Sequence, residues 1–147
     1  MDTLNDDPDE LPVKPKRVLI FTTVTLLSLL SVCKSGYVDG TFKSQSRNWK
    51  QLFVVMVDYC DTAIPIMFCW LPDKKFISYY MVVFFLFFCF NKYRDEIRNL
   101  TGKDLIRLRK IKCDFEWNIH RAFSLFKVFK MFYFSTIDIS SLDSRSL

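Results

Sequence analysis

Two long uncharged segments constrain this chain more than any other feature of its sequence. Residues 18–33 and residues 76–91 contain no charged side chain, and a basic residue bounds each segment on both sides. Such segments form either the core of a globular domain or the spans of a membrane protein. A spanning helix needs about 20 apolar residues, and each segment has only 16. The sequence favours a core, with a small two-span membrane protein as the alternative.

Length and composition narrow the class of protein. The chain has 147 residues, of which half are hydrophobic, so it predicts one domain and excludes a wholly disordered chain. The five cysteines include no CxxC pair, and His120 is the single histidine. A disulfide scaffold and a structural zinc site are therefore not expected. Residues 1–16 hold five acids and three prolines, which predicts an acidic flexible leader.

The pattern along the rest of the chain predicts strands first and helices later. Valine-rich and aromatic runs of strand length are found at residues 36–42, 49–59, 64–71 and 108–115. Residues 76–100 are expected to form one long helix that ends near Gly102. Residues 116–130 have apolar residues at helical spacing. The predicted order is β-β-β-α-β-α, which belongs to the α+β class.

Two aspartates stand out because they lie in apolar, strand-like surroundings. Asp39 follows a valine in VDGTF, and Asp114 follows a cysteine in CDFE. A carboxylate in such a place is costly unless it is paired, hydrogen-bonded or bound to a metal. On neighbouring strands the two could share a divalent cation such as Mg²⁺ or Mn²⁺. The alternative is structural: Asp39 would begin a turn with Gly40, and Asp114 would cap the following helix.

Four segments, taken in order over residues 17–130, resemble the MULE (Mutator-like element) transposase domain. The first two are the stretch that carries DGTF at residues 39–42 and the QLFVVMV strand after it. IPIMFCWLPDKK at residues 64–75 is similar to the family's next strand, and a tyrosine-containing helix follows. IKCDFEWNIHRAF at residues 111–123 resembles the segment with the second catalytic acid. The order of the segments carries the resemblance, because DGTF and DFE are short.

The resemblance implies an RNase H-like mixed sheet and a DDE-type transposase that cuts and joins DNA with three carboxylates and Mg²⁺ or Mn²⁺. Asp39 would be the first catalytic and metal-binding acid and Asp114 the second. Glu116 accompanies the motif without being the third acid, which in the family lies beyond a CxxH-type strand. That strand is missing here, and only Asp138 and Asp143 remain downstream. We therefore expect a domain that is incomplete at its C-terminus, with a polar tail at residues 131–147, and that is not catalytic alone.

The resemblance also suggests partners and a compartment. DNA would be the ancestral partner, a full-length transposase or a second copy a further one, and the nucleus the compartment. Residues 92–130 carry a local excess of basic side chains, as a polyanion-binding surface would. The candidate DNA contacts are Lys43, Arg107, Arg109, Lys110 and Lys112. Three alternatives stay open. The basic residues could form only a solvated face, the chain could be a non-catalytic protein-interaction module with the same fold, or it could be the membrane protein described above.

Overall fold

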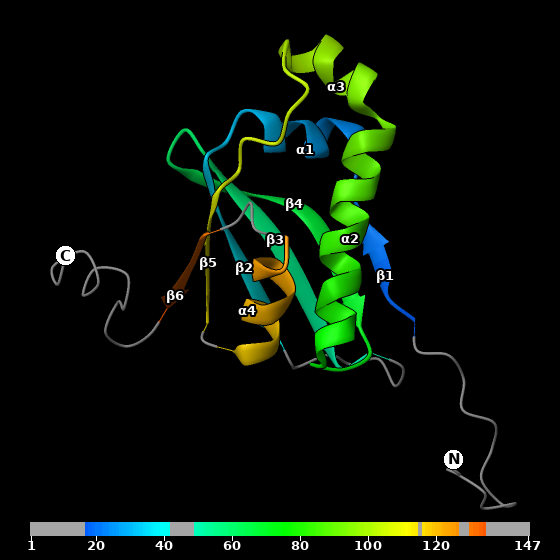
Figure 1. The fold of residues 1–147 in the computed structure, drawn as a ribbon, viewed down its shortest axis with the longest axis vertical. Helices are drawn as coiled ribbons and strands as arrows, with labels where there is room; N and C mark the ends of the chain where they lie inside the picture. The colour runs from blue at the N-terminus through cyan, green and yellow to red at the C-terminus, as the bar shows by residue number, and fades with distance from the viewer. Residues whose placement is uncertain (1–16, 42–48, 115, 127–129, 135–147) are drawn as a thin grey trace, which may run out of the picture.

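The computed structural model describes residues 17–41, 49–114, 116–126 and 130–134. The expected leader at residues 1–16 lies outside these residues, as does Lys43. Within them the chain forms one mixed sheet with helices against it (Figure 1), which confirms the α+β class.

Within the described residues the sheet has six strands, in the order β1-β4-β3-β2-β5-β6. Strands β1, β4, β3 and β2 are antiparallel neighbours, whereas β2, β5 and β6 are parallel. The strands are β1 (Leu19–Phe21), β2 (Ser35–Thr41), β3 (Gln51–Tyr59), β4 (Thr62–Leu71), β5 (Lys110–Asp114) and β6 (Lys130–Phe134). β2, β3, β4 and β5 fall where the sequence predicts strands.

One face of the sheet is buried, and burial alternates residue by residue along β3. In β3, Phe53, Val55 and Val57 are fully buried, and the residues between them are only partly buried. This period of two is that of a strand with one face in the core. Gly36 in β2 is needed for close approach to β3, since a side-chain Cβ there would lie 2.4 Å from the backbone oxygen of Met56.

The helices pack against that buried face (Figure 1). They are α1 (Val24–Ser28), the 3-10 turn η1 (Leu29–Ser31), α2 (Phe76–Lys92), α3 (Arg94–Thr101) and α4 (Trp117–Ser124). α2 buries Tyr79, Val83 and Leu86 among the sheet residues. α3 ends at Gly102, whose φ of 74° gives the left-handed C-cap that glycine adopts without strain.

The structure corrects several predicted boundaries. The helix expected at residues 76–100 is two helices, α2 and α3, which meet at a bend of 73°. The helix expected at residues 116–130 ends at Ser124. Residues 18–33 form a strand, a short helix and a 3-10 turn. Part of the segment expected as a polar tail forms β6, so the sheet has a further strand after α4.

The membrane alternative requires two spanning helices. In the described part of the chain no single helix is long and apolar enough to span a membrane, and only the bent pair of α2 and α3 passes on length and composition.

Candidate functional site

Asp39 and Asp114 come together from two neighbouring parallel strands. The register of β2 and β5 pairs Gly36 with Ile111 and Tyr37 with Lys112. Two residues further along both strands, the same register brings Asp39 level with Asp114. The structural alternatives, in which Asp39 begins a turn and Asp114 caps the following helix, are both wrong. Asp39 lies inside β2, and the N-cap of α4 is Glu116.

Both carboxylates project from the face of the sheet that the helices leave open. The neighbours of Asp39 along β2 pair with buried Phe53 and Val55, while Asp39 itself pairs with Val54. In β5, Cys113 is buried and Asp114 is exposed. Since side chains alternate between the two faces of a sheet, the carboxylates share the outer face.

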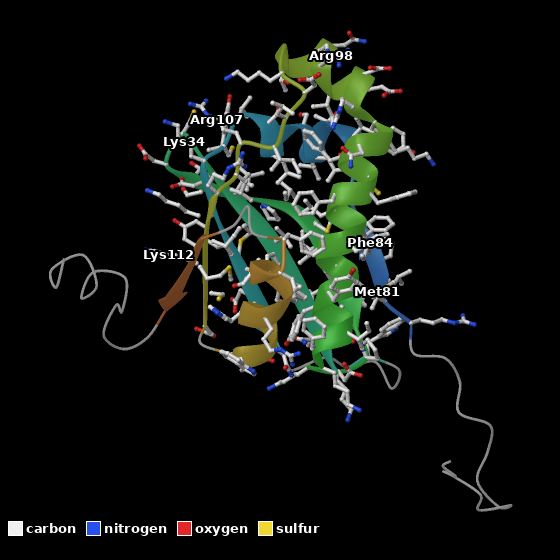
Figure 2. The ribbon with its side chains drawn as sticks, viewed as in Figure 1. Lys34, Met81, Phe84, Arg98, Arg107 and Lys112 are labelled. Carbon is white, nitrogen blue, oxygen red and sulfur yellow. The ribbon has the colours of Figure 1, made fainter. Side chains whose placement is uncertain are left out.

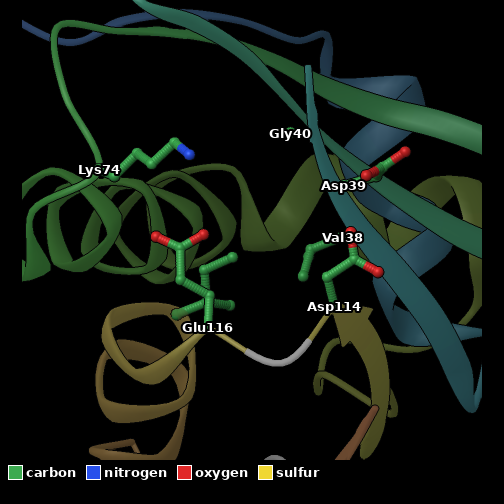
Figure 3. Close-up of a pocket in the computed structure, with 7 residues that line it drawn as sticks. Val38, Asp39, Gly40, Lys74, Asp114 and Glu116 are labelled. Atoms are coloured by element: carbon green, nitrogen blue, oxygen red, sulfur yellow. The ribbon is translucent and has the colours of Figure 1, made fainter. Parts of the chain in front are cut away.

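The pair lies at the rim of a hollow of about 360 Å³. Its walls come from the ends of β2 and β5, the turn before α2 and the start of α4. The lining residues are Val38, Asp39, Gly40, Lys74, Asp114, Glu116 and Ile119. In Figure 3 the two aspartates lie on one side of the hollow, with Lys74 and Glu116 on the other. The hollow therefore holds three acids and one base, but the acids do not form one cluster.

The charge of Asp114 acts on Asp39. Partial desolvation raises the pKa of the Asp39 carboxyl above its ordinary value, and the nearby negative charge of Asp114 raises it further. A hydrogen bond with the backbone of Gly40 lowers the same pKa in part. The net direction is upward. Two like charges at one place favour either a bound proton or a bound cation.

Glu116 is held by a partly buried hydrogen-bond network. The Tyr79 hydroxyl donates to Glu116 Oε1 at 2.8 Å, and Gln51 Nε2 donates to the Tyr79 hydroxyl at 2.9 Å. Gln51 Nε2 also donates to the carbonyl of Asp73 at 3.1 Å. Burial raises the pKa of Tyr79, so its hydroxyl remains a donor. The network fixes the Glu116 carboxylate against the core.

The metal ligands available in the described residues are few. No group of three or more His, Cys, Asp or Glu side chains in those residues could hold a metal ion. Asp39 and Asp114 could supply two carboxylate ligands, and Asp138 and Asp143 lie outside the described residues. Two carboxylates fit one Mg²⁺ or Mn²⁺ ion that keeps several of its waters.

The predicted DNA contacts are placed along one side of the molecule. Lys110 and Lys112 lie on β5, and Arg107 precedes the strand (Figure 2). Arg109 is turned back on the chain, because its Nη1 donates to the carbonyl oxygens of Ile106 and Leu108 at 2.7 and 3.0 Å. Four of the five predicted residues are thus described, and Arg109 is engaged locally.

Sequence reasoning did not identify three residues at or near the site. Lys74 lines the hollow, and Tyr79 donates a hydrogen bond to Glu116. Lys34, which precedes β2, lies near Arg107 in Figure 2. The turn sequence PDKK at residues 72–75 could have drawn attention to Lys74, because it places two lysines directly before a helix. Nothing local marks Tyr79, because its partner is 37 residues away.

Comparison of this chain with protein-family models, with curated proteins and with solved structures finds no match.

Proposed function

We propose that this chain is a transposase-derived, RNase H-like domain that binds DNA and a divalent cation and does not cut DNA by itself. The observation that carries the proposal is the pairing of Asp39 and Asp114 on adjacent parallel strands, beside a hollow. Paired acids of this kind suit a hard cation that in turn binds a phosphate.

The order of the strands supports the same proposal. Three antiparallel strands, β4, β3 and β2, are followed in the sheet by parallel β5 and β6. This arrangement is compatible with an RNase H-like fold. The first acid then comes from the central strand β2 and the second from its parallel neighbour β5, as the resemblance to MULE transposases implies.

The residues of the site suit binding better than catalysis. A bound Mg²⁺ or Mn²⁺ would neutralise the two aspartates and orient a phosphate oxygen. Hydrolysis by two metal ions needs further carboxylates to hold both ions. Glu116 is the next acid at the hollow, and its carboxylate is bonded to Tyr79. The described residues therefore supply a site for one ion.

The test is a titration of the full chain with Mn²⁺, in which electron paramagnetic resonance measures the free ion. Since two carboxylates and water make a weak site, we expect a Kd on the order of 0.1–1 mM. Asp39→Asn and Asp114→Asn should each weaken binding at least about tenfold.

Asp61→Asn serves as the matched control, because Asp61 is an exposed aspartate in the turn between β3 and β4. It should bind Mn²⁺ as the unmodified chain does. Binding at millimolar Mn²⁺ that does not depend on Asp39 would overturn the proposal.

A further inference from the structure

One side of α2 exposes a row of large apolar side chains, here called the α2 stripe. It consists of Ile77, Met81, Phe84 and Phe88, whose exposed fractions are 54%, 44%, 48% and 52%. Figure 2 labels Met81 and Phe84 on α2. Single exposed apolar residues are common on protein surfaces, but a continuous row marks an interaction site.

The other sides of α2 are already covered. Toward the sheet, Val82 and Leu86 are fully buried. Toward α4, the rings of Tyr80 and Phe87 stack on Phe126 with centroids 5.7 and 4.9 Å apart. The α2 stripe is the remaining side, and it is as apolar as the covered ones.

The spacing of the α2 stripe is that of a helix-pairing seam. Its members follow one another by four, three and four residues, which is the heptad pattern that places side chains along one line of a helix. The seam runs for about 16 Å at 1.5 Å per residue. No charged residue interrupts α2 between Phe76 and Asn91.

A hollow of about 290 Å³ lies beside the stripe, between α2 and the edge strand β1. Val18 and Ile20 form one wall, and Phe85 with three members of the stripe forms the other. The surface is thus a ridge next to an apolar groove. Surfaces of this shape accept the side chains of a second helix as knobs in holes.

We propose that the α2 stripe is the interface for a second copy of this chain, with the two α2 helices antiparallel about a two-fold axis. A two-fold interface must be self-complementary. The α2 stripe has no charged residue, and its spacing of four, three and four residues is the same when it is followed from either end. Met81 of one copy then lies opposite Phe84 of the other, and Ile77 opposite Phe88. The inference stands apart from the proposed metal and DNA binding.

The size of the surface predicts a weak, reversible dimer. Four half-exposed side chains of this size would remove about 400 Å² per copy, since a large aromatic residue buries about 150–250 Å² in full. The walls of the hollow add to this area. Interfaces below about 1,200 Å² in total are those of weak complexes, so we expect a Kd on the order of 10–100 µM.

A lipid surface suits the stripe less well than a second copy. Helices that lie on membranes usually pair their apolar face with a face rich in Lys and Arg. In α2 the one basic residue is Lys92, at its last position, and the opposite face is buried in the core. The hollow beside the stripe is also better filled by the protruding side chains of a protein than by a lipid surface.

Sedimentation equilibrium of the full chain between 1 and 500 µM tests the proposal. The unmodified chain should dimerise, and Met81→Glu and Phe84→Lys should each weaken dimerisation more than about tenfold, because each buries a charge against an apolar partner. Leu105→Lys is the matched control, since Leu105 is 69% exposed and outside the stripe.

Mixing the two variants tests the antiparallel arrangement. In the mixed dimer the new carboxylate at position 81 faces the new ammonium at position 84, and the second pair is the original Met81 with Phe84. Equimolar Met81→Glu and Phe84→Lys chains should therefore dimerise at least about tenfold better than either alone.

Three results would overturn the proposal. They are a chain that stays monomeric to 500 µM, a dimer that the stripe variants do not weaken, and a mixture with no gain over its components. Flotation of a monomeric chain with phosphatidylcholine–phosphatidylserine vesicles, abolished by Phe84→Lys, would assign the stripe to a membrane instead.

Discussion

At the scale of single residues, ionising the Asp39 carboxyl costs free energy in the folded chain, because the group is partly desolvated and lies near the negative charge of Asp114. No other residue of β2 carries a carboxyl group. The Asp39 carboxyl lies close to that of Asp114, on a strand whose other residues are apolar or small. The raised pKa of Asp39 reports this cost, since the folded chain holds the proton more tightly than the unfolded chain does. A residue that destabilises its own fold in this way is a candidate for binding a ligand.

The raised pKa predicts a pH-dependent effect of Asp39→Asn. The favourable contribution of protonated Asp39 is present below the ordinary pKa of 3.8 and is lost as the pH rises through the higher pKa of the folded chain. The Tm of Asp39→Asn should therefore equal that of the unmodified chain near pH 3 and exceed it near pH 7. The gain should be small, because the side chain is exposed.

Thermal melts at the two pH values measure this difference. An equal gain at pH 3 and pH 7 would mean that the asparagine acts through something other than charge. Millimolar Mg²⁺ should reduce the difference at pH 7, since the cation relieves the same repulsion.

At the scale of elements, α2 has apolar residues both on the side that faces the core and on the side that faces outward. Its buried side packs on the sheet, and its outer side carries the α2 stripe at similar hydrophobicity. The sequence of α2 does not show which side of the helix faces the core, because a helix that is apolar on all sides has no single core-facing stripe. The bend of 73° at Tyr93 begins α3, where charged residues return.

Leucine-to-alanine substitutions distinguish the buried side of α2 from an exposed helical position. Leu86 is fully buried in α2, whereas Leu100 in α3 is 57% exposed. Leu86→Ala should lower the free energy of unfolding by about 2–5 kcal/mol through the cavity that it leaves. Leu100→Ala should change it by less than about 1 kcal/mol. Urea denaturation of both variants measures the two values, and equal losses would contradict the placement of α2.

At the scale of the whole molecule, the helices lie on one side of the sheet (Figure 1). The alternation of buried and exposed residues along β2 and β5 places the paired aspartates on the other side. Phe21 and Phe68 are cross-strand partners on the same outer face and are exposed by 52% and 39%. Lys110 and Lys112 share that face with Asp114, because they alternate with buried residues of β5. If the chain binds DNA as proposed, the nucleic acid should approach this outer face.

This arrangement predicts the salt dependence of DNA binding. Each phosphate contact contributes a slope of about 0.9 in a plot of log K against log salt. Lys110→Ala/Lys112→Ala should therefore reduce the slope by about 2 and weaken binding to any duplex sequence. Fluorescence anisotropy between 50 and 200 mM salt measures the slope.

Lys92→Ala/Lys103→Ala is the control with the same change in net charge, since Lys92 ends α2 and Lys103 follows α3. If both double variants lose the same slope, DNA is attracted by the overall charge of the chain and not by β5.

The sequence by itself determined the strands whose own residues alternate or run apolar. β2, β3, β4 and β5 could be predicted, because a period of two and valine-rich runs are local properties. The two aspartates could be singled out for the same reason, as carboxylates in apolar strands. The single break in the long helix and the end of α4 could not, since helix propensity changes little across either boundary.

Only the tertiary structure decided the rest. β1 has three residues and is a strand through its hydrogen bonds to β4, and β6 is one through its pairing with β5. Asp39 meets Asp114 because β2 and β5 pair in parallel at one register. Glu116 accepts a hydrogen bond from Tyr79 of α2 and does not join the two aspartates in one cluster. Contacts between residues distant in sequence depend on how the elements pack, and no local pattern in the chain encodes that packing.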